Sequence, residues 1–114
     1  MRLNENQIKT ITTLAKKHFS DDVQVYLFGS RTDDRKRGGD IDLLIRTPEE
    51  SDLSTIRKLS YLAELKKVMG DRKIDVVIDN AHIRSKQNFY RSITRNYILI
   101  TDKWWFIMFL HEEK

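Results

Sequence analysis

Two aspartates stand one residue apart where an apolar segment begins, in the run DIDLLI at residues 40–45. Because alternate residues of a β-strand project from the same face, the side chains of Asp40 and Asp42 would lie next to each other. Two like charges at this spacing repel unless a cation or hydrogen-bond donors compensate them, and carboxylate oxygens suit Mg²⁺ or Mn²⁺. The pair therefore predicts a divalent-metal site. The alternative explanation is a capped turn at Asp40 and a solvated strand edge at Asp42.

A third carboxylate opens a later strand, in the run KIDVVID at residues 73–79. Asp75 and Asp79 share one face of this strand by parity, so either can complete the site if the two strands are neighbours. We prefer Asp75, because it lies near the same end of its strand as the first two aspartates do of theirs. Asp79 stands beside Asn80, and we interpret Asp79 as a helix N-cap.

A glycine and a serine follow the strand predicted at residues 23–28 without a break. Gly29 lacks a Cβ, so the backbone can approach a phosphate closely, and Ser30 adds a hydroxyl donor. If Ser30 and Arg31 begin a short helical turn, the N–H groups of that turn add partial positive charge. We therefore assign Gly29, Ser30 and Arg31 to an anion site. Three further cations in the loop are left as acceptor or partner contacts: Arg35, Lys36 and Arg37.

The remaining periodicity predicts a small α/β (α+β) domain, with a mixed β-sheet covered by helices. The strand at 40–45 is continuously apolar after its start, as in a buried central strand. A helical crossover joins it to the strand at 73–79, which favours parallel pairing, whereas a loop joins the first two strands. The predicted elements are a helix at 5–19, strands at 23–28 and 40–45, a helix at 53–69 ended by Gly70, a strand at 73–79, a helix at 82–95 and a short strand at 97–101.

Length and composition fit one domain spanning residues 1–114. The net charge of +4 and the pI near 9.4 favour anionic partners without choosing among them. The chain has no cysteine, which excludes disulfides and thiolate chemistry and suits the cytoplasm. The first residues lack the apolar core of a signal peptide, so we do not expect export.

An apolar run, WWFIMFL at residues 104–110, is the unusual feature of the C-terminal segment 103–114. Its seven residues fall far short of the ~20 that a membrane span requires, so we expect no membrane segment. Such a run is typical of a surface for a partner or for self-association into a homo-oligomer. The alternative is that this segment folds back over the sheet.

Taken together, the Gly-Ser turn, the spacer of nine residues, the Asp-Ile-Asp run and the later strand aspartate resemble the nucleotidyltransferase superfamily of DNA polymerase beta. The similarity is greatest to its minimal nucleotidyltransferases (MNT), which include MntA-type antitoxins that accompany a HEPN-domain partner. It covers residues from about 23 to 79. Asp34 stands where many members have a glycine, and Gly39 where they have a serine, so the resemblance is weaker in this loop.

The resemblance implies a polymerase-beta-like fold and a role for each residue of the motif. Gly29 and Ser30 would bind the triphosphate, while Asp40, Asp42 and Asp75 would be both the metal ligands and the catalytic carboxylates. Two Mg²⁺ ions, or Mn²⁺ in their place, would support attack by an acceptor hydroxyl on the α-phosphate, with release of pyrophosphate. The favoured reaction transfers AMP from ATP, and the acceptor suggested by the family is a HEPN ribonuclease toxin.

Two other functional classes remain open from the sequence. A non-catalytic antitoxin would keep the nucleotidyltransferase fold and bind its partner through its surface alone. A nucleic-acid-binding role follows from the basic balance of the chain, although we do not expect nucleic acid to be the main partner.

Overall fold

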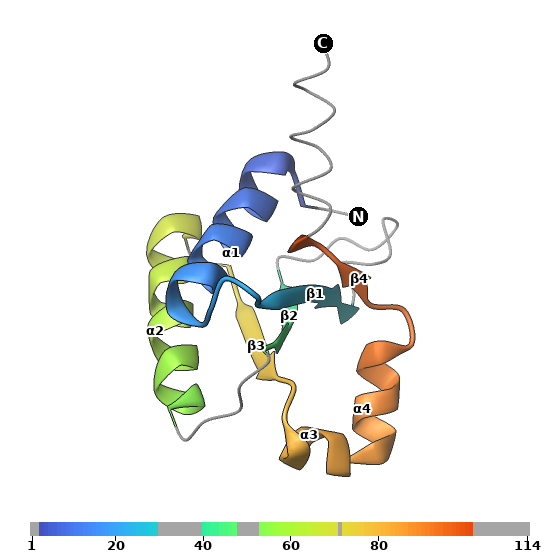
Figure 1. Cartoon of the computed structure of the whole chain (residues 1–114). Helices are drawn as coiled ribbons and strands as arrows, with labels where there is room; N and C mark the ends of the chain where they lie inside the picture. Colours follow the sequence, from blue (N-terminus) through green and yellow to red (C-terminus); the bar gives the residue numbers. More distant parts are fainter. Residues whose placement is uncertain (1–2, 30–39, 48–52, 71, 102–114) are drawn as a thin grey trace.

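A computed structural model describes residues 3–29, 40–47, 53–70 and 72–101. These residues form a mixed α+β domain in which helices pack against a four-stranded sheet (Figure 1). The elements in chain order are α1 (Glu5–His18), β1 (Gln24–Phe28), β2 (Ile41–Arg46), α2 (Ser54–Met69), β3 (Ile74–Ile78), α3 (Ala81–Ser85), α4 (Gln87–Thr94) and β4 (Ile98–Leu99).

The strand order across the sheet is β3-β2-β1-β4. β2 and β3 are parallel and are joined by the helical crossover through α2, whereas β1 is antiparallel to both β2 and β4. The mixed sheet and the parallel pairing of β2 with β3 are therefore confirmed. The last strand is shorter than predicted and consists of Ile98 and Leu99, although the Ile100 N–H also donates a hydrogen bond to the Val25 carbonyl of β1.

The main core lies between one face of the sheet and the helices α1 and α2, which Figure 1 shows side by side. β2 supplies Ile41, Leu43 and Ile45, all with no exposed surface, which fits the buried central strand expected from the sequence. Full burial of each such side chain stabilises the fold by about 1.5–3 kcal/mol. Tyr61 of α2 is also fully buried and donates a hydrogen bond of 2.9 Å to the carbonyl of Ile11 in α1.

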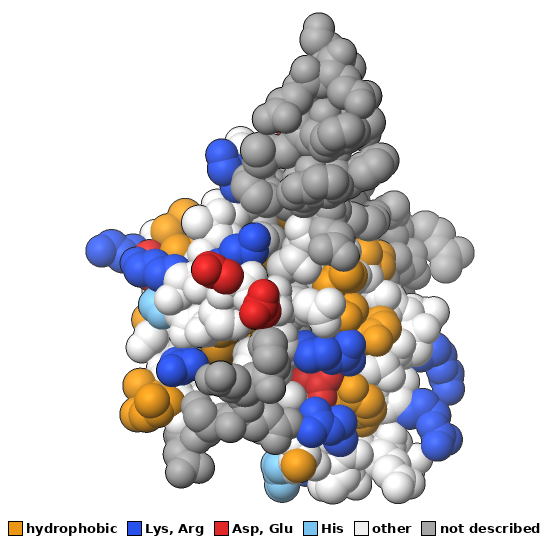
Figure 2. All heavy atoms as spheres, viewed as in Figure 1, with side chains coloured by type: hydrophobic (Ala, Val, Ile, Leu, Met, Phe, Trp, Pro, Cys, Tyr) orange, Lys and Arg blue, Asp and Glu red, His pale blue; other side chains and the backbone are white. Residues whose placement is uncertain are grey.

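The opposite face of the sheet carries a smaller apolar cluster that holds α4. Tyr26, Leu44 and Ile93 form its buried part, with Tyr90 of α4 and Tyr97 packed around them. The rings of Tyr26 and Tyr97 are stacked, with centroids 4.3 Å apart. The helices α3 and α4 lie together away from α1 and α2 (Figure 1), and Lys and Arg side chains gather over them on the face shown in Figure 2.

Asp79 anchors α3 and α4 to the end of the sheet, and it does not cap a helix as the sequence had suggested. Its side chain is nearly buried and accepts hydrogen bonds from Arg46 Nε at 2.9 Å, Arg84 Nη1 at 2.8 Å and the Tyr90 hydroxyl at 2.9 Å. The cap of α3 is Asn80, whose side chain accepts from the backbone N–H of Ile83. The N-cap prediction was therefore wrong by one residue, because the side chain of Asp79 is engaged by Arg46, Arg84 and Tyr90 instead.

The helix predicted at 82–95 is divided into α3 and α4 at Lys86, whose φ and ψ of −84° and 74° are not helical. The Lys86 N–H donates to the Ile83 carbonyl, which closes α3, and the change of direction lets Tyr90 reach Asp79. Within α2, the apolar periodicity covers two sides of the helix. Tyr61 and Leu65 are buried, whereas four apolar side chains on or beside α2 are exposed: Leu53, Ile56, Leu59 and Val68.

Two sets of predictions fall on residues outside the described part of the chain, namely those on the loop that contains Ser30 and those on the segment 103–114. Within the described ranges, no helix is long and apolar enough to cross a membrane.

We predict that Asp79→Asn lowers the free energy of unfolding by about 2–3 kcal/mol at pH 7, because it replaces the buried carboxylate by a neutral amide and leaves half-buried Arg46 without its counter-charge. Burial alone would raise the pKa of Asp79, but the hydrogen bonds from Arg46, Tyr90 and Arg84 hold it below its ordinary value of 3.8. A lowered pKa stabilises the fold above about pH 4, and this contribution disappears as pH falls through the lowered pKa. Urea unfolding between pH 7 and pH 3 measures both effects.

The matched control is Asp22→Asn, which changes an exposed carboxylate in the turn before β1 and should stay within about 0.5 kcal/mol of wild type. A loss below about 1 kcal/mol for Asp79→Asn at pH 7, or a loss that does not shrink at acid pH, would contradict this role.

Candidate active site

The candidate site is built on the pairing of β2 with β3. In the register of these parallel strands, Asp42 lies opposite Asp75, and Phe28 of β1 lies opposite Asp42 on the other side. Neighbouring strands are ~4.8 Å apart, so the two carboxylates share one face at one end of the sheet. Asp42 is half-buried and Asp75 is exposed. The structure thus brings together Asp75 and Asp42, as the sequence analysis preferred.

Gly29 lies directly after β1 and against the carboxylate of Asp42. Its φ of +75° is in the left-handed region that favours glycine. A Cβ at this position would overlap an oxygen of Asp42 and would lie 3.2 Å from its Cγ. Glycine is therefore required for two reasons, the backbone conformation and the close approach to Asp42.

The carboxylates repel each other in a place that water only partly reaches. Burial, followed by the charge and hydrogen bonding of Asp75 and the charge of Asp40, raises the pKa of Asp42 above its ordinary value of 3.8. Lys73 opposes this effect weakly, since its Nζ is 4.0 Å from Asp75 Oδ2 and both side chains are mostly exposed. The site therefore has an excess of negative charge that a cation would relieve.

Asp40 stands just before β2, which begins at Ile41, and it is exposed. Its charge acts on Asp42, so it lies in the same electrostatic environment.

The described residues contain no set of three acidic, histidine or cysteine side chains arranged to hold a metal. The chemistry of Asp42 and Asp75 nevertheless fits a hard divalent cation. Both residues supply carboxylate oxygens, and a bound cation would relieve the repulsion between them. Ser30 and Arg31 lie outside the described residues.

Asp79, the alternative third carboxylate, lies at the far end of β3 and both of its oxygens already accept hydrogen bonds. The structure therefore separates the two candidates, with Asp75 beside Asp42 and Asp79 in the anchor of α3 and α4. Sequence reasoning missed Lys73 as a member of the acidic cluster. The signal was parity, because Lys73 and Asp75 are two residues apart and strand residues at that spacing share a face.

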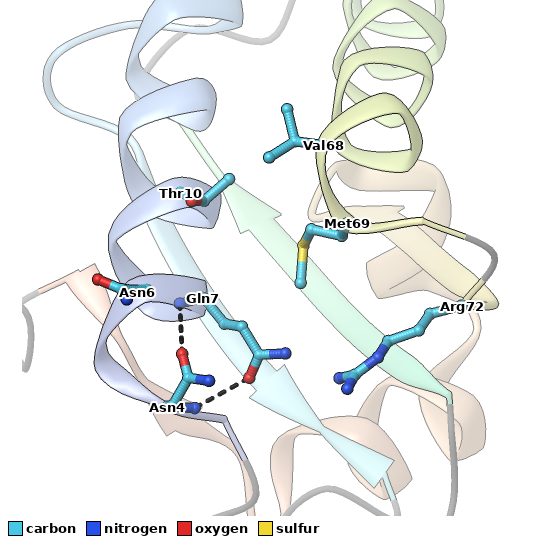
Figure 3. A pocket seen from close by; sticks show the side chains of 7 residues that line it. All are labelled: Asn4, Asn6, Gln7, Thr10, Val68, Met69 and Arg72. Atoms are coloured by element: carbon cyan, nitrogen blue, oxygen red, sulfur yellow. Dashed lines mark hydrogen bonds between the residues drawn. The ribbon is translucent and has the colours of Figure 1, made fainter.

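A hollow of about 300 Å³ lies between the start of α1 and the end of α2 (Figure 3), and neither Asp42 nor Asp75 is among the described residues that line it. Its walls are mostly polar. Asn4 and Gln7 bond reciprocally there in the capping box that begins α1, and Arg72 is directed toward Gln7. The described residues that line this hollow are one cation, several amides, a threonine and two apolar side chains, and they form no constellation of acids and bases for catalysis.

We predict that Asp42→Asn raises the melting temperature by about 2–4 °C at pH 7.5 in EDTA, because it removes the repulsion with Asp75. A carboxyl whose pKa is raised on folding destabilises the fold above that pKa, and the penalty disappears as pH falls and Asp42 is protonated. Thermal unfolding at pH 7.5 and pH 4 should therefore give a gain that shrinks at pH 4, with Asp22→Asn as the control. A lower melting temperature for Asp42→Asn at pH 7.5 would contradict the account of repulsion.

Comparisons with known proteins agree on the fold. The chain is similar to three solved structures, and each similarity covers 97% of this chain and 90% of the chain compared. One structure is a toxin–antitoxin with AMP-PNP (20% identity, TM-score 0.61), and another is a tri-AMPylated Shewanella oneidensis HEPN toxin in complex with MNT antitoxin (15% identity, TM-score 0.59). The third is the toxin–antitoxin MntA-HpeT with two aspartates, two positions apart, changed to glutamate (20% identity, TM-score 0.60). Among curated proteins, none matches this sequence significantly. The family described as Polymerase beta, Nucleotidyltransferase matches residues 9–103. Because this match covers most of the chain, the protein belongs to the polymerase beta nucleotidyltransferase family.

Proposed function

We propose that this chain is a Mg²⁺-dependent nucleotidyltransferase that moves AMP from ATP to a hydroxyl acceptor in trans, as the antitoxin that adenylylates a HEPN ribonuclease toxin. The observation that carries this proposal is the pairing of Asp42 with Asp75 against the Gly29 turn, in a chain of the nucleotidyltransferase family. Repelling carboxylates beside a left-handed glycine form a place where a metal-bound triphosphate would relieve the charge.

In the proposed reaction the acceptor oxygen attacks the α-phosphorus of ATP, a new P–O bond forms, and the bond to the leaving pyrophosphate breaks. Mg²⁺, when bound, would supply the positive charge that stabilises the oxygens of the phosphates during this exchange. Asp40 and Asp42 would hold the cation, and Asp75, the more exposed of the two paired carboxylates, would also accept the proton of the hydroxyl. We assign Ser30 and Arg31, together with Gly29, to the phosphates of ATP.

A partner in trans is supported by the outer side of α2. Leu53, Ile56 and Leu59 are 50%, 61% and 59% exposed there, a grouping that monomeric proteins rarely leave uncovered without a function. The structural neighbours that contain a HEPN toxin or AMP-PNP suggest which partner and which nucleotide to test first. The same apolar side chains favour the second candidate function, a non-catalytic antitoxin that acts by binding alone.

Co-expression with a HEPN ribonuclease, followed by intact-mass measurement of the ribonuclease, tests the chemistry. Wild type is expected to add whole AMP units. Asp42→Asn and Asp75→Asn should each reduce the rate of AMP incorporation at least about a hundredfold, because each removes a group that acts on the reacting atoms. Asp22→Asn, which changes a carboxylate away from the site, should behave like wild type.

Growth of cells that express the ribonuclease separates the two functions. If folded Asp42→Asn no longer protects the cells, protection depends on the chemistry. Full protection by Asp42→Asn without AMP on the ribonuclease would overturn the enzymatic proposal in favour of binding alone.

A further inference from the structure

A second pocket, of about 270 Å³, lies where the start of α2 meets α3 and α4. Its polar lining includes Ser54 and Lys58 from α2, His82 from α3 and Lys86 at the junction of α3 with α4. Ser54 and Lys58 are four residues apart and so share one side of α2. Among the described residues that line the pocket, none is acidic. This part of the lining is therefore cationic, unlike the carboxylate site.

The pocket is separate from the candidate active site. Val77 and Ile78 both line it, although neighbouring strand residues point to opposite faces, so the pocket extends across the outer edge of β3. Neither Asp42 nor Asp75 is among the described lining residues, and the lining residue of β3 nearest to Asp75 is Val77, two residues further on, or roughly 7 Å at about 3.3 Å per residue. A ligand here would not occupy the position between Asp42 and Asp75.

Within the part of the chain that the structure describes, no carboxylate pairs with the two lysines of this pocket. Within the described ranges, neither Lys58 nor Lys86 forms an ion pair, and Lys86 is exposed. The chain from residue 80 to residue 101 contains no aspartate or glutamate at all. Figure 2 shows the resulting basic surface over α3 and α4. Such unpaired cations attract phosphate groups.

An exposed aromatic ring stands next to the lysines. Phe89 is 43% exposed and lines the same pocket as Lys86. The two residues are three positions apart at the start of α4, a spacing that brings side chains near each other. An exposed ring beside cations is the combination on which nucleobases stack while lysines hold the phosphate. At about 270 Å³ the pocket suits one nucleotide unit and is small for a larger cofactor.

We propose that this pocket binds one nucleotide unit, with its phosphate between Lys58 and Lys86 and its base against Phe89. The hydroxyls of Ser54 and Thr55 would donate to phosphate or ribose oxygens. The start of α2 adds partial positive charge, since its N-cap residue, Leu53, supplies no side-chain acceptor. The unit is either a free mononucleotide or part of a single-stranded RNA, and this site goes beyond the proposed transfer reaction.

Calorimetric titration of AMP and of hexa-adenylate RNA into the full chain, in EDTA, tests the proposal without using the carboxylate site. Binding of at least one probe is expected, and it should persist in Asp42→Asn. Binding of AMP alone identifies a free nucleotide. Tighter binding of the RNA, with a slope of log affinity against log salt of about −0.7 for the one phosphate held in the pocket, identifies an RNA strand.

The double variant Lys58→Glu with Lys86→Glu should weaken binding of the active probe at least about tenfold, and Phe89→Ala at least about fivefold. The matched control reverses two exposed cations elsewhere, Lys16→Glu with Arg95→Glu, and keeps the same net charge as the double variant. Equal losses in the two double variants would overturn the pocket in favour of general charge attraction. Absence of binding by either probe to folded wild type would also overturn it.

Discussion

The electrostatic repulsion between Asp42 and Asp75 is the constraint around which the rest of this structure is arranged. Parallel pairing of β2 with β3 fixes the two carboxylates at neighbouring positions, and neither can turn to the other face without disrupting the strand register. Burial and the charge of Asp75 raise the pKa of Asp42, which is a cost to the folded state at neutral pH. A cationic ligand bound between the two carboxylates would remove this destabilisation, and such a ligand is expected in a nucleotidyltransferase.

The two faces of the sheet divide the work of stability and chemistry. Full burial of the apolar side chains of β2 against α1 and α2 holds the strand that carries Asp42. On the other face, Asp75 of β3 and Asp79, which directly follows β3, have opposite environments, because Asp75 meets carboxylates while Asp79 meets the cations of Arg46 and Arg84. The same residue type on one strand face thus serves a reactive site at one end and an anchor for α3 and α4 at the other.

The sequence predicted those parts of the fold that depend on local pattern. The alternating and then apolar run at 40–45 predicted a buried strand, and parity with the later strand predicted that Asp75 could join the pair. It did not predict the role of Asp79, because the donors that engage it come from residues distant in the chain. Nor did the periodicity of α2 reveal which apolar side chains, such as Ile56, would face solvent. Both failures reflect tertiary packing, which a local pattern does not contain.

The measurement that tests the central claim most directly is calorimetric titration of ATP into the protein with and without Mg²⁺, repeated on Asp42→Asn. The account predicts a Mg²⁺-dependent component of binding in wild type that is absent from the variant, although the variant is folded and at least as stable at neutral pH. Equal Mg²⁺-dependent binding by wild type and Asp42→Asn would contradict the claim that the repelling carboxylates of β2 and β3 form the site for the metal-bound nucleotide.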